Sequence, residues 1–179
     1  MRRAMHDFCA EAARRGVLQQ DGSIPAEQQR RIIAENPRLM FPVCETAMTI
    51  GYEQIPKSAQ QYLSLDPRAA GREMCLLTIR GGGLTADGSI PPATLTRLYR
   101  QHPAFGAPFL FAGLVSSYDQ SPVPGIDRQT YIKVARRVSY QAFAEGLVST
   151  TSLSASGYKI DRARFRILFA RELRRVRGY

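Results

Sequence analysis

Apolar residues recur along this chain at spacings of three and four positions, in segments that each begin just after an isoleucine. These isoleucines are Ile24, Ile55, Ile90, Ile126 and Ile160, which lie 31, 35, 36 and 34 residues apart. Spacings of three and four are typical of one face of an amphipathic helix. A near-constant period of this size is typical of stacked supersecondary units. The pattern therefore predicts an all-α chain of about five repeated units.

The residues that follow each isoleucine predict where the helices begin. They are Pro25, Pro56, Pro91, Asp127 and Asp161. Proline favours the first position of a helix, and an aspartate can accept hydrogen bonds from the free amides there. Three further prolines predict helix ends, because proline cannot continue a helix; these are Pro37, Pro67 and Pro103.

Two segments share the run Asp-Gly-Ser-Ile-Pro in matching surroundings. They are GVLQQDGSIP at 16–25 and GGLTADGSIP at 82–91. In each, we expect the aspartate to cap a sharp turn and the glycine that follows it to take the positive φ that the turn needs. The predicted structural loop residues are Asp21, Gly22, Ile24, Asp87, Gly88 and Ile90.

A helix, a loop containing Asp-Gly-x-Ile and a second helix resemble the EF-hand, most specifically in these two segments. In that family the isoleucine pairs briefly with the backbone of a partner loop, and oxygen ligands in the loop hold calcium. The resemblance implies paired units, with a first pair at 1–67 and a second at 68–138. A fifth unit at 139–179, with an arginine-rich C-terminal helix, is left unpaired and is expected to meet a partner.

The calcium ligands of an EF-hand are missing from both specific loops. The first, third and twelfth loop positions are Val17, Gln19 and Gln28 in one, and Gly83, Thr85 and Thr94 in the other. The fourth unit offers Asp119 at the first position and little else. Calcium requires six to eight oxygens, so the units resemble EF-hands stripped of their ligands. We expect no metal and no cofactor, and a calcium sensor is disfavoured.

A rival interpretation is an array of pentatricopeptide or tetratricopeptide type, whose units are helix pairs of similar length. The segment from Cys44 to Pro67 could form one such hairpin. Against this, the first and third units have long loops between their helices, where those families turn tightly.

The sequence contains no motif for catalysis, so we expect a non-enzymatic protein. The two histidines, His6 and His102, are far apart and have no metal-ligand spacing. The three cysteines, Cys9, Cys44 and Cys75, form no CxxC pair and are odd in number. We expect them to be buried free thiols in a reducing compartment, since a free cysteine usually behaves as a small buried hydrophobe.

The basic charge is concentrated in the second half of the chain. The formal net charge is +10. Residues 1–90 carry 11 basic and 10 acidic side chains, whereas residues 91–179 carry 14 and 5. Because all but three of the 25 basic residues are arginines, the excess favours binding of phosphate or carboxylate groups.

The last predicted helix, from Asp161 to Val176, is the densest part of this charge. Phe165, Leu168, Phe169, Leu173 and Val176 predict its buried stripe. Candidate nucleic-acid-binding residues on the helix and its tail are Arg162, Arg164, Arg166, Arg171, Arg174, Arg175 and Arg177. Aligned arginines neutralise phosphates without reading sequence. A solvated face that meets acidic groups of a neighbouring subunit remains an alternative.

Taken together, these features predict a structural subunit of a large ribonucleoprotein, with other protein subunits as partners and RNA as a candidate partner of the basic second half. The mitochondrial ribosome or its assembly machinery is the expected host, although the acids Asp7 and Glu11 argue against a transit peptide at the N-terminus. The alternative is a protein–protein adaptor in a cytoskeletal or axonemal complex, gripping a helix in an apolar groove that involves Phe109 or Phe143. We expect no membrane insertion, since no apolar run is long enough to cross a bilayer.

Overall fold

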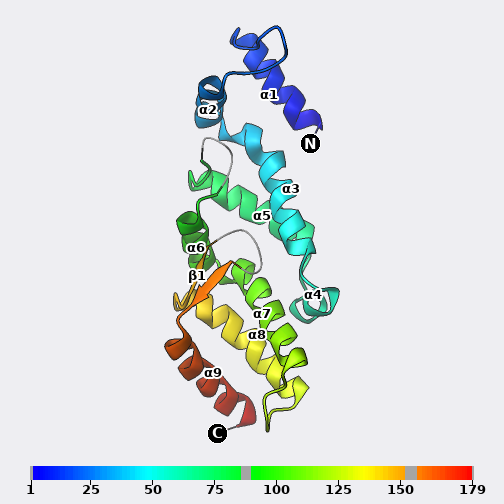
Figure 1. The fold of residues 1–179 in the computed structure, drawn as a ribbon, viewed down its shortest axis with the longest axis vertical. Coiled ribbons are helices and arrows are strands. Elements are labelled where there is room, and N and C mark those ends of the chain that lie inside the picture. Colours follow the sequence, from blue (N-terminus) through cyan, green and yellow to red (C-terminus); the bar gives the residue numbers. More distant parts are fainter. Residues whose placement is uncertain (1, 86–89, 152–156, 179) are drawn as a thin grey trace. The chain divides into compact units, whose positions relative to one another are not determined.

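The structure is a computed structural model that describes residues 2–85, 90–151 and 157–178 (Figure 1). Helices hold 72% of the described residues, and a two-stranded sheet is the only sheet among them. The expected all-α class is therefore correct at the level of a mostly helical protein. The exception is one short strand pair, which the helical periodicity did not predict.

The described residues form nine α-helices and one 3-10 turn. They are α1 (Arg2–Arg14), α2 (Ala26–Glu35), α3 (Phe41–Glu53), α4 (Lys57–Leu63), α5 (Pro67–Arg80), α6 (Pro92–Gln101), α7 (Pro103–Gln120), α8 (Arg128–Ala144) and α9 (Arg162–Arg177). The 3-10 turn η1 (Pro37–Met40) precedes α3, and the strands β1 (Val148–Thr150) and β2 (Tyr158–Ile160) lie between α8 and α9.

Each of the five isoleucines lies two residues ahead of a helix, as the repeat predicts. The helices that follow them are α2, α4, α6, α8 and α9. Asp127 and Asp161 cap the last two: their carboxylates accept hydrogen bonds from the backbone N of Thr130 (2.9 Å) and Arg164 (3.1 Å). Pro25 and Pro56 stand at the N-cap, one position before the first helical residue.

The same local geometry recurs 66 residues apart, at the ends of α1 and α5. Gly16 follows α1 with φ +67° and Gly82 follows α5 with φ +60°. The next residue closes the helix end in both: Val17 N donates to Ala12 O (3.0 Å), and Gly83 N donates to Thr78 O (2.9 Å). These are C-terminal caps that a left-handed glycine permits.

The backbone conformation just before the next helical segment also matches at the two places. Asn36 (φ −139°, ψ 73°) precedes Pro37, and His102 (φ −128°, ψ 70°) precedes Pro103. The residue before a proline is pushed into extended backbone, which ends α2 and α6, while the proline opens the next helical segment. The prolines therefore separate helices where we expected them to.

By their contacts, the described residues divide into two compact units, 1–50 with 68–91 and 51–67 with 92–179. This division cuts the chain at different places from the expected pairs 1–67 and 68–138 and the fifth unit 139–179. The pairing of the repeats that those ranges express stays a prediction.

The first unit contains a close crossing of α3 and α5. Gly71 on α5 lies so near Thr49 on α3 that an added Cβ would come within 2.7 Å of the Thr49 backbone N. Cys44 and Cys75 are buried on the same pair of helices, whereas Cys9 on α1 is exposed. The prediction that all three thiols are buried is thus wrong for Cys9, because α1 is covered on one side only.

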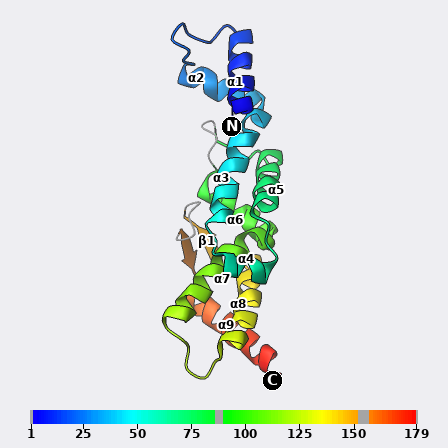
Figure 2. The same ribbon diagram turned by 90° about the vertical axis from the view of Figure 1, so that its right-hand side faces the viewer.

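In the second unit, α7 and α8 lie side by side and α9 packs along α8, as both views show (Figures 1 and 2). The buried centre is aromatic. Phe143 meets Tyr99 and Tyr158 edge to face, with ring centroids 5.5 and 5.7 Å apart, an arrangement that adds to the burial of apolar area. The hydroxyl of Tyr52 donates to Phe105 O (2.9 Å).

The two strands of the loop between α8 and α9 pair with each other. β1 and β2 are antiparallel, with Val148 opposite Ile160. In the first loop, Gln19 N donates to Ser23 O (2.9 Å), at the matching place beside Ile24. The EF-hand resemblance implied pairing between neighbouring loops, so these two pairings within single loops differ from that expectation.

Candidate nucleic-acid interface

All seven arginines of α9 are exposed, because the helix buries only one face. Leu168 is buried, and Phe165, Phe169, Leu173 and Val176 are partly covered. The exposed arginines are Arg162, Arg164, Arg166, Arg171, Arg174, Arg175 and Arg177. The apolar stripe predicted from the sequence is therefore the one that packs against the rest of the second unit. The arginines occupy the remaining circumference of the helix.

Five of these arginines make no side-chain hydrogen bond or ion pair with another described residue: Arg162, Arg164, Arg166, Arg174 and Arg175. The other two are engaged. Arg171 donates to Glu145 Oε1 (2.8 Å) and to Gln141 (3.2 Å), and Arg177 donates to the carbonyl oxygen of Gly125. The hydrogen bond with Glu145 raises the pKa of Arg171. Unneutralised positive charge on one helix attracts anions.

Helix α8 adds a second basic stripe that the sequence analysis missed. Lys133, Arg136, Arg137 and Tyr140 are exposed on it at spacings of three and four. Their spacing places them on one face, and this periodicity was the signal that could have revealed them. Since Arg171 of α9 bonds Gln141 and Glu145 of α8, the basic surfaces of the two helices adjoin.

One buried carboxylate lies beneath this surface and pairs with two of its arginines. Glu172 is 1% exposed, and its oxygens lie 3.5 Å from Arg171 Nε and 3.9 Å from Arg137 Nη1. A buried carboxylate needs such cations, because its charge is costly away from water. Arg137 and Arg171 pair with this acid, whereas Arg164, Arg174 and Arg175 are among the α9 arginines without a side-chain partner in the described part of the chain.

An apolar residue lies in the middle of the arginine face. Ile167 is 69% exposed and has Arg164 three positions before it and Arg171 four positions after it. Residues at these spacings are neighbours on a helix surface. The face can therefore offer one apolar contact between charges, a feature that phosphate binding alone does not use.

Phe109 and Phe143, considered as residues of an adaptor groove, are both buried core residues of the second unit. An open groove cannot present them, because their rings already pack against Tyr99. Substituting either would disturb the core and would not report on partner binding.

The structural loop residues are described in the first loop and in part in the third. The Ser23 side chain and the Ser23 backbone N, which donates to the Asp21 carboxylate (2.9 Å), lower the pKa of Asp21, and Gly22 has φ +79°. Ile24 is half-buried. In the third loop Ile90 is buried, and Asp87 and Gly88 lie outside the described residues.

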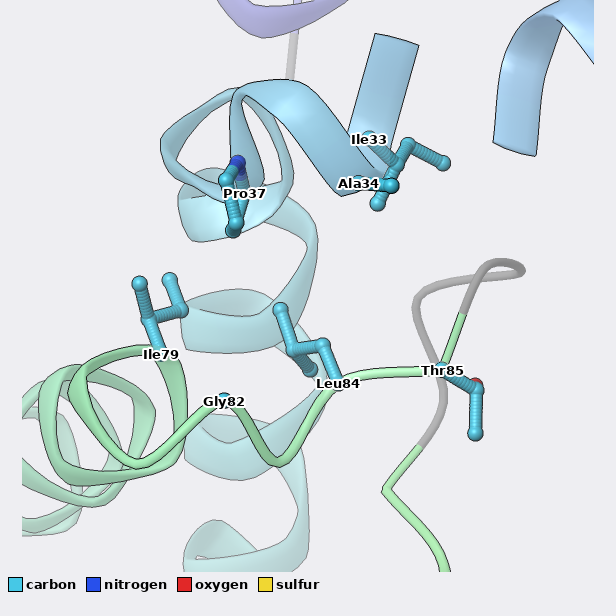
Figure 3. Close-up of a pocket in the computed structure, with 7 residues that line it drawn as sticks. All are labelled: Ile33, Ala34, Pro37, Ile79, Gly82, Leu84 and Thr85. Carbon is cyan, nitrogen blue, oxygen red and sulfur yellow. The ribbon is translucent and has the colours of Figure 1, made fainter. Parts of the chain in front are cut away.

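The first unit also has a small apolar hollow of about 200 Å³ (Figure 3). Ile33, Ala34 and Pro37 line it from one side, and Ile79, Gly82, Leu84 and Thr85 from the other. No ionisable side chain lines it, and it is smaller than the usual ligand pocket. Among these lining residues, the Thr85 hydroxyl is the only polar side-chain group.

Neither metal clusters nor spanning helices occur in 2–85, 90–151 and 157–178. No three His, Cys, Asp or Glu residues there lie close enough to hold a metal ion, and none of the helices there could cross a membrane. Asp119, the one acid at a first loop position, is bound by Arg128 (2.8 Å). Comparison with protein-family models, curated proteins and solved structures found no match for this chain.

Proposed function

We propose that this protein is a non-enzymatic structural subunit of a large ribonucleoprotein, with the exposed face of α9 and α8 against RNA. The observation that carries the proposal is the set of five exposed arginines on α9 whose side chains have no hydrogen-bond or ion-pair partner in the described part of the chain. A mitochondrial host, such as the ribosome there or its assembly machinery, is part of the proposal. It is supported by the arginine-rich composition and the sequence pI of about 10.1.

The test is binding of single-stranded polyuridine RNA at a series of salt concentrations. In the variant Arg164→Gln, Arg174→Gln, Arg175→Gln, we expect the slope of log affinity against log salt to fall by about 2. Each phosphate contact on a single strand contributes roughly 0.7 to that slope. The affinity at 0.1 M salt should fall on the order of 100-fold.

A variant with the same loss of charge elsewhere is the control. Arg38, Arg72 and Arg80 are exposed residues of the first unit, and changing all three to glutamine should leave the slope nearly unchanged. An equal loss in both variants would mean that net charge, and not this face, holds the RNA. An affinity that does not depend on salt would sink the proposal.

A second candidate function is a protein–protein adaptor, favoured by the exposed Ile167 among arginines. An acidic helix with one apolar residue would suit such a face. Ile167→Ala separates the two functions, because an RNA complex held by phosphates should be insensitive to it. A protein complex centred on Ile167 should lose about tenfold or more in affinity, the loss expected for a central apolar contact.

We also propose that the five units are EF-hand-like helix–loop–helix repeats without calcium ligands. Support comes from the five isoleucines, each two residues ahead of a helix. The non-ligand residues Val17, Gln19 and Gln28 add support from the first loop.

We accordingly expect calorimetric titration of the full chain to show no calcium site tighter than about 10 µM, the sensor range. The physical reason is the lack of carboxylates at the loop positions. The carboxylate of Asp21 is already used by Ser23 N, 2.9 Å away. A tighter site that disappears in Asp21→Asn contradicts this expectation.

A further inference from the structure

Two thiols lie beside one another in the interior of the first unit. Cys44 on α3 is 4% exposed and Cys75 on α5 is fully buried. Each of these two thiols shifts the pKa of the other. The Cys75 thiol is also 3.4 Å from the carbonyl oxygen of Phe41, one helical turn before Cys44. Both thiols are free in this structure.

The helices that carry the two thiols approach closely beside them. Gly71, one turn before Cys75, stands where an added Cβ would come within 2.5 Å of the Thr49 hydroxyl. A disulfide needs Cα atoms no more than about 7 Å apart. The close contact at Gly71 and the 3.4 Å contact of the Cys75 thiol with Phe41 O favour a spacing of the two cysteines in that range.

The two thiols are unequal in pKa. Interaction with the Cys75 side chain lowers the pKa of Cys44, whereas interaction with the Cys44 side chain, together with burial, raises the pKa of Cys75. The thiolate is the nucleophile in disulfide chemistry. Cys44 is also the less buried of the two, so it is the residue that would meet an oxidant first.

We propose that Cys44 and Cys75 form a reversible disulfide site, at which a small disulfide such as oxidised glutathione links α3 to α5. The Cys44 thiolate attacks one sulfur of the oxidant, forming a mixed disulfide and releasing one glutathione thiolate. The Cys75 thiol then loses its proton and attacks the Cys44 sulfur, which forms the protein disulfide and releases the second glutathione. The protein loses two protons and two electrons, and one oxidised glutathione becomes two reduced ones.

The disulfide would link the two separate stretches of the chain that form the first unit. The first unit consists of residues 1–50 and 68–91, and Cys44 and Cys75 lie on either side of the segment 51–67. Closing this stretch limits the freedom of the unfolded chain. The oxidised form should therefore unfold at a temperature on the order of 5–10 °C above that of the reduced form.

The test is incubation of the full chain with a range of oxidised-to-reduced glutathione ratios. Remaining thiols are then alkylated under denaturing conditions, and the peptides are analysed by mass spectrometry. We expect a cross-linked peptide pair containing Cys44 and Cys75, which reduction with dithiothreitol removes, and alkylation of Cys9 alone among the three cysteines. The ratio at half-oxidation gives the reduction potential of the pair.

Cys9→Ser is the matched control, because Cys9 is exposed on another helix and its loss should leave the cross-link intact. Cys44→Ser and Cys75→Ser should each abolish it. Peptide mapping of the chain without substitutions tests for the disulfide even where a serine variant folds poorly. If Cys44 and Cys75 both remain alkylatable while only Cys9 carries glutathione or joins two chains, the proposal is overturned.

Discussion

Phe143→Ala is expected to lower the free energy of unfolding by about 3–5 kcal/mol, the usual cost of truncating a buried phenylalanine. Phe143 is 1% exposed, and its ring lies edge to face with Tyr99 and Tyr158. Removing the ring creates a cavity and ends both aromatic contacts at once. Urea denaturation followed by far-ultraviolet circular dichroism measures the loss.

Tyr140→Ala is the matched control, three residues earlier on the same helix. Tyr140 is 49% exposed on the basic stripe, so its truncation should change the free energy of unfolding by no more than about 0.5 kcal/mol. Equal losses for Phe143→Ala and Tyr140→Ala would contradict the described orientation of α8.

The second large effect is expected at the crossing of α3 and α5. In Gly71→Ala, the new methyl group would lie within 2.7 Å of the Thr49 backbone N and 2.9 Å of its Cα. Backbone atoms cannot rotate away as a side chain can, so the two helices must move apart. We expect a cost of about 1–3 kcal/mol, as for other overpacked sites, measured as a fall in the urea midpoint.

Gly113→Ala tests the same chemical change without the steric conflict. Gly113 is in the interior of α7, is exposed, and has no atom within 4 Å of an added Cβ. Alanine is the better helix former, so this variant should be more stable by about 0.5–1 kcal/mol. A neutral or stabilising Gly71→Ala would show that α3 and α5 are farther apart than described.

Two positions 66 residues apart, Val43 on α3 and Phe109 on α7, have different surroundings. Val43 is exposed, whereas Phe109 is buried. The Phe109 ring lies among rings from three other elements, with centroids 4.9 Å from Tyr52, 6.4 Å from Tyr99 and 6.5 Å from Tyr158. Side chains from distant parts of the chain therefore cover the phenylalanine.

The sequence by itself determined where the helices begin. Five isoleucines each followed by proline or aspartate mark five helix starts, because N-terminal capping and the proline ring act within a few residues. The buried stripe of α9 was likewise readable, since an amphipathic helix carries its own periodicity. These are local effects, and no distant part of the chain is needed to produce them.

Only the tertiary structure decided which charged and reactive groups meet. The spacing of Lys133, Arg136, Arg137 and Tyr140 does not say that this stripe adjoins the arginines of α9. The two basic surfaces adjoin because α9 packs along α8. Likewise, Cys44 and Cys75 look unrelated in a list of three cysteines, yet the α3–α5 crossing places their thiols together. Such contacts depend on long-range packing, whose register no local pattern encodes.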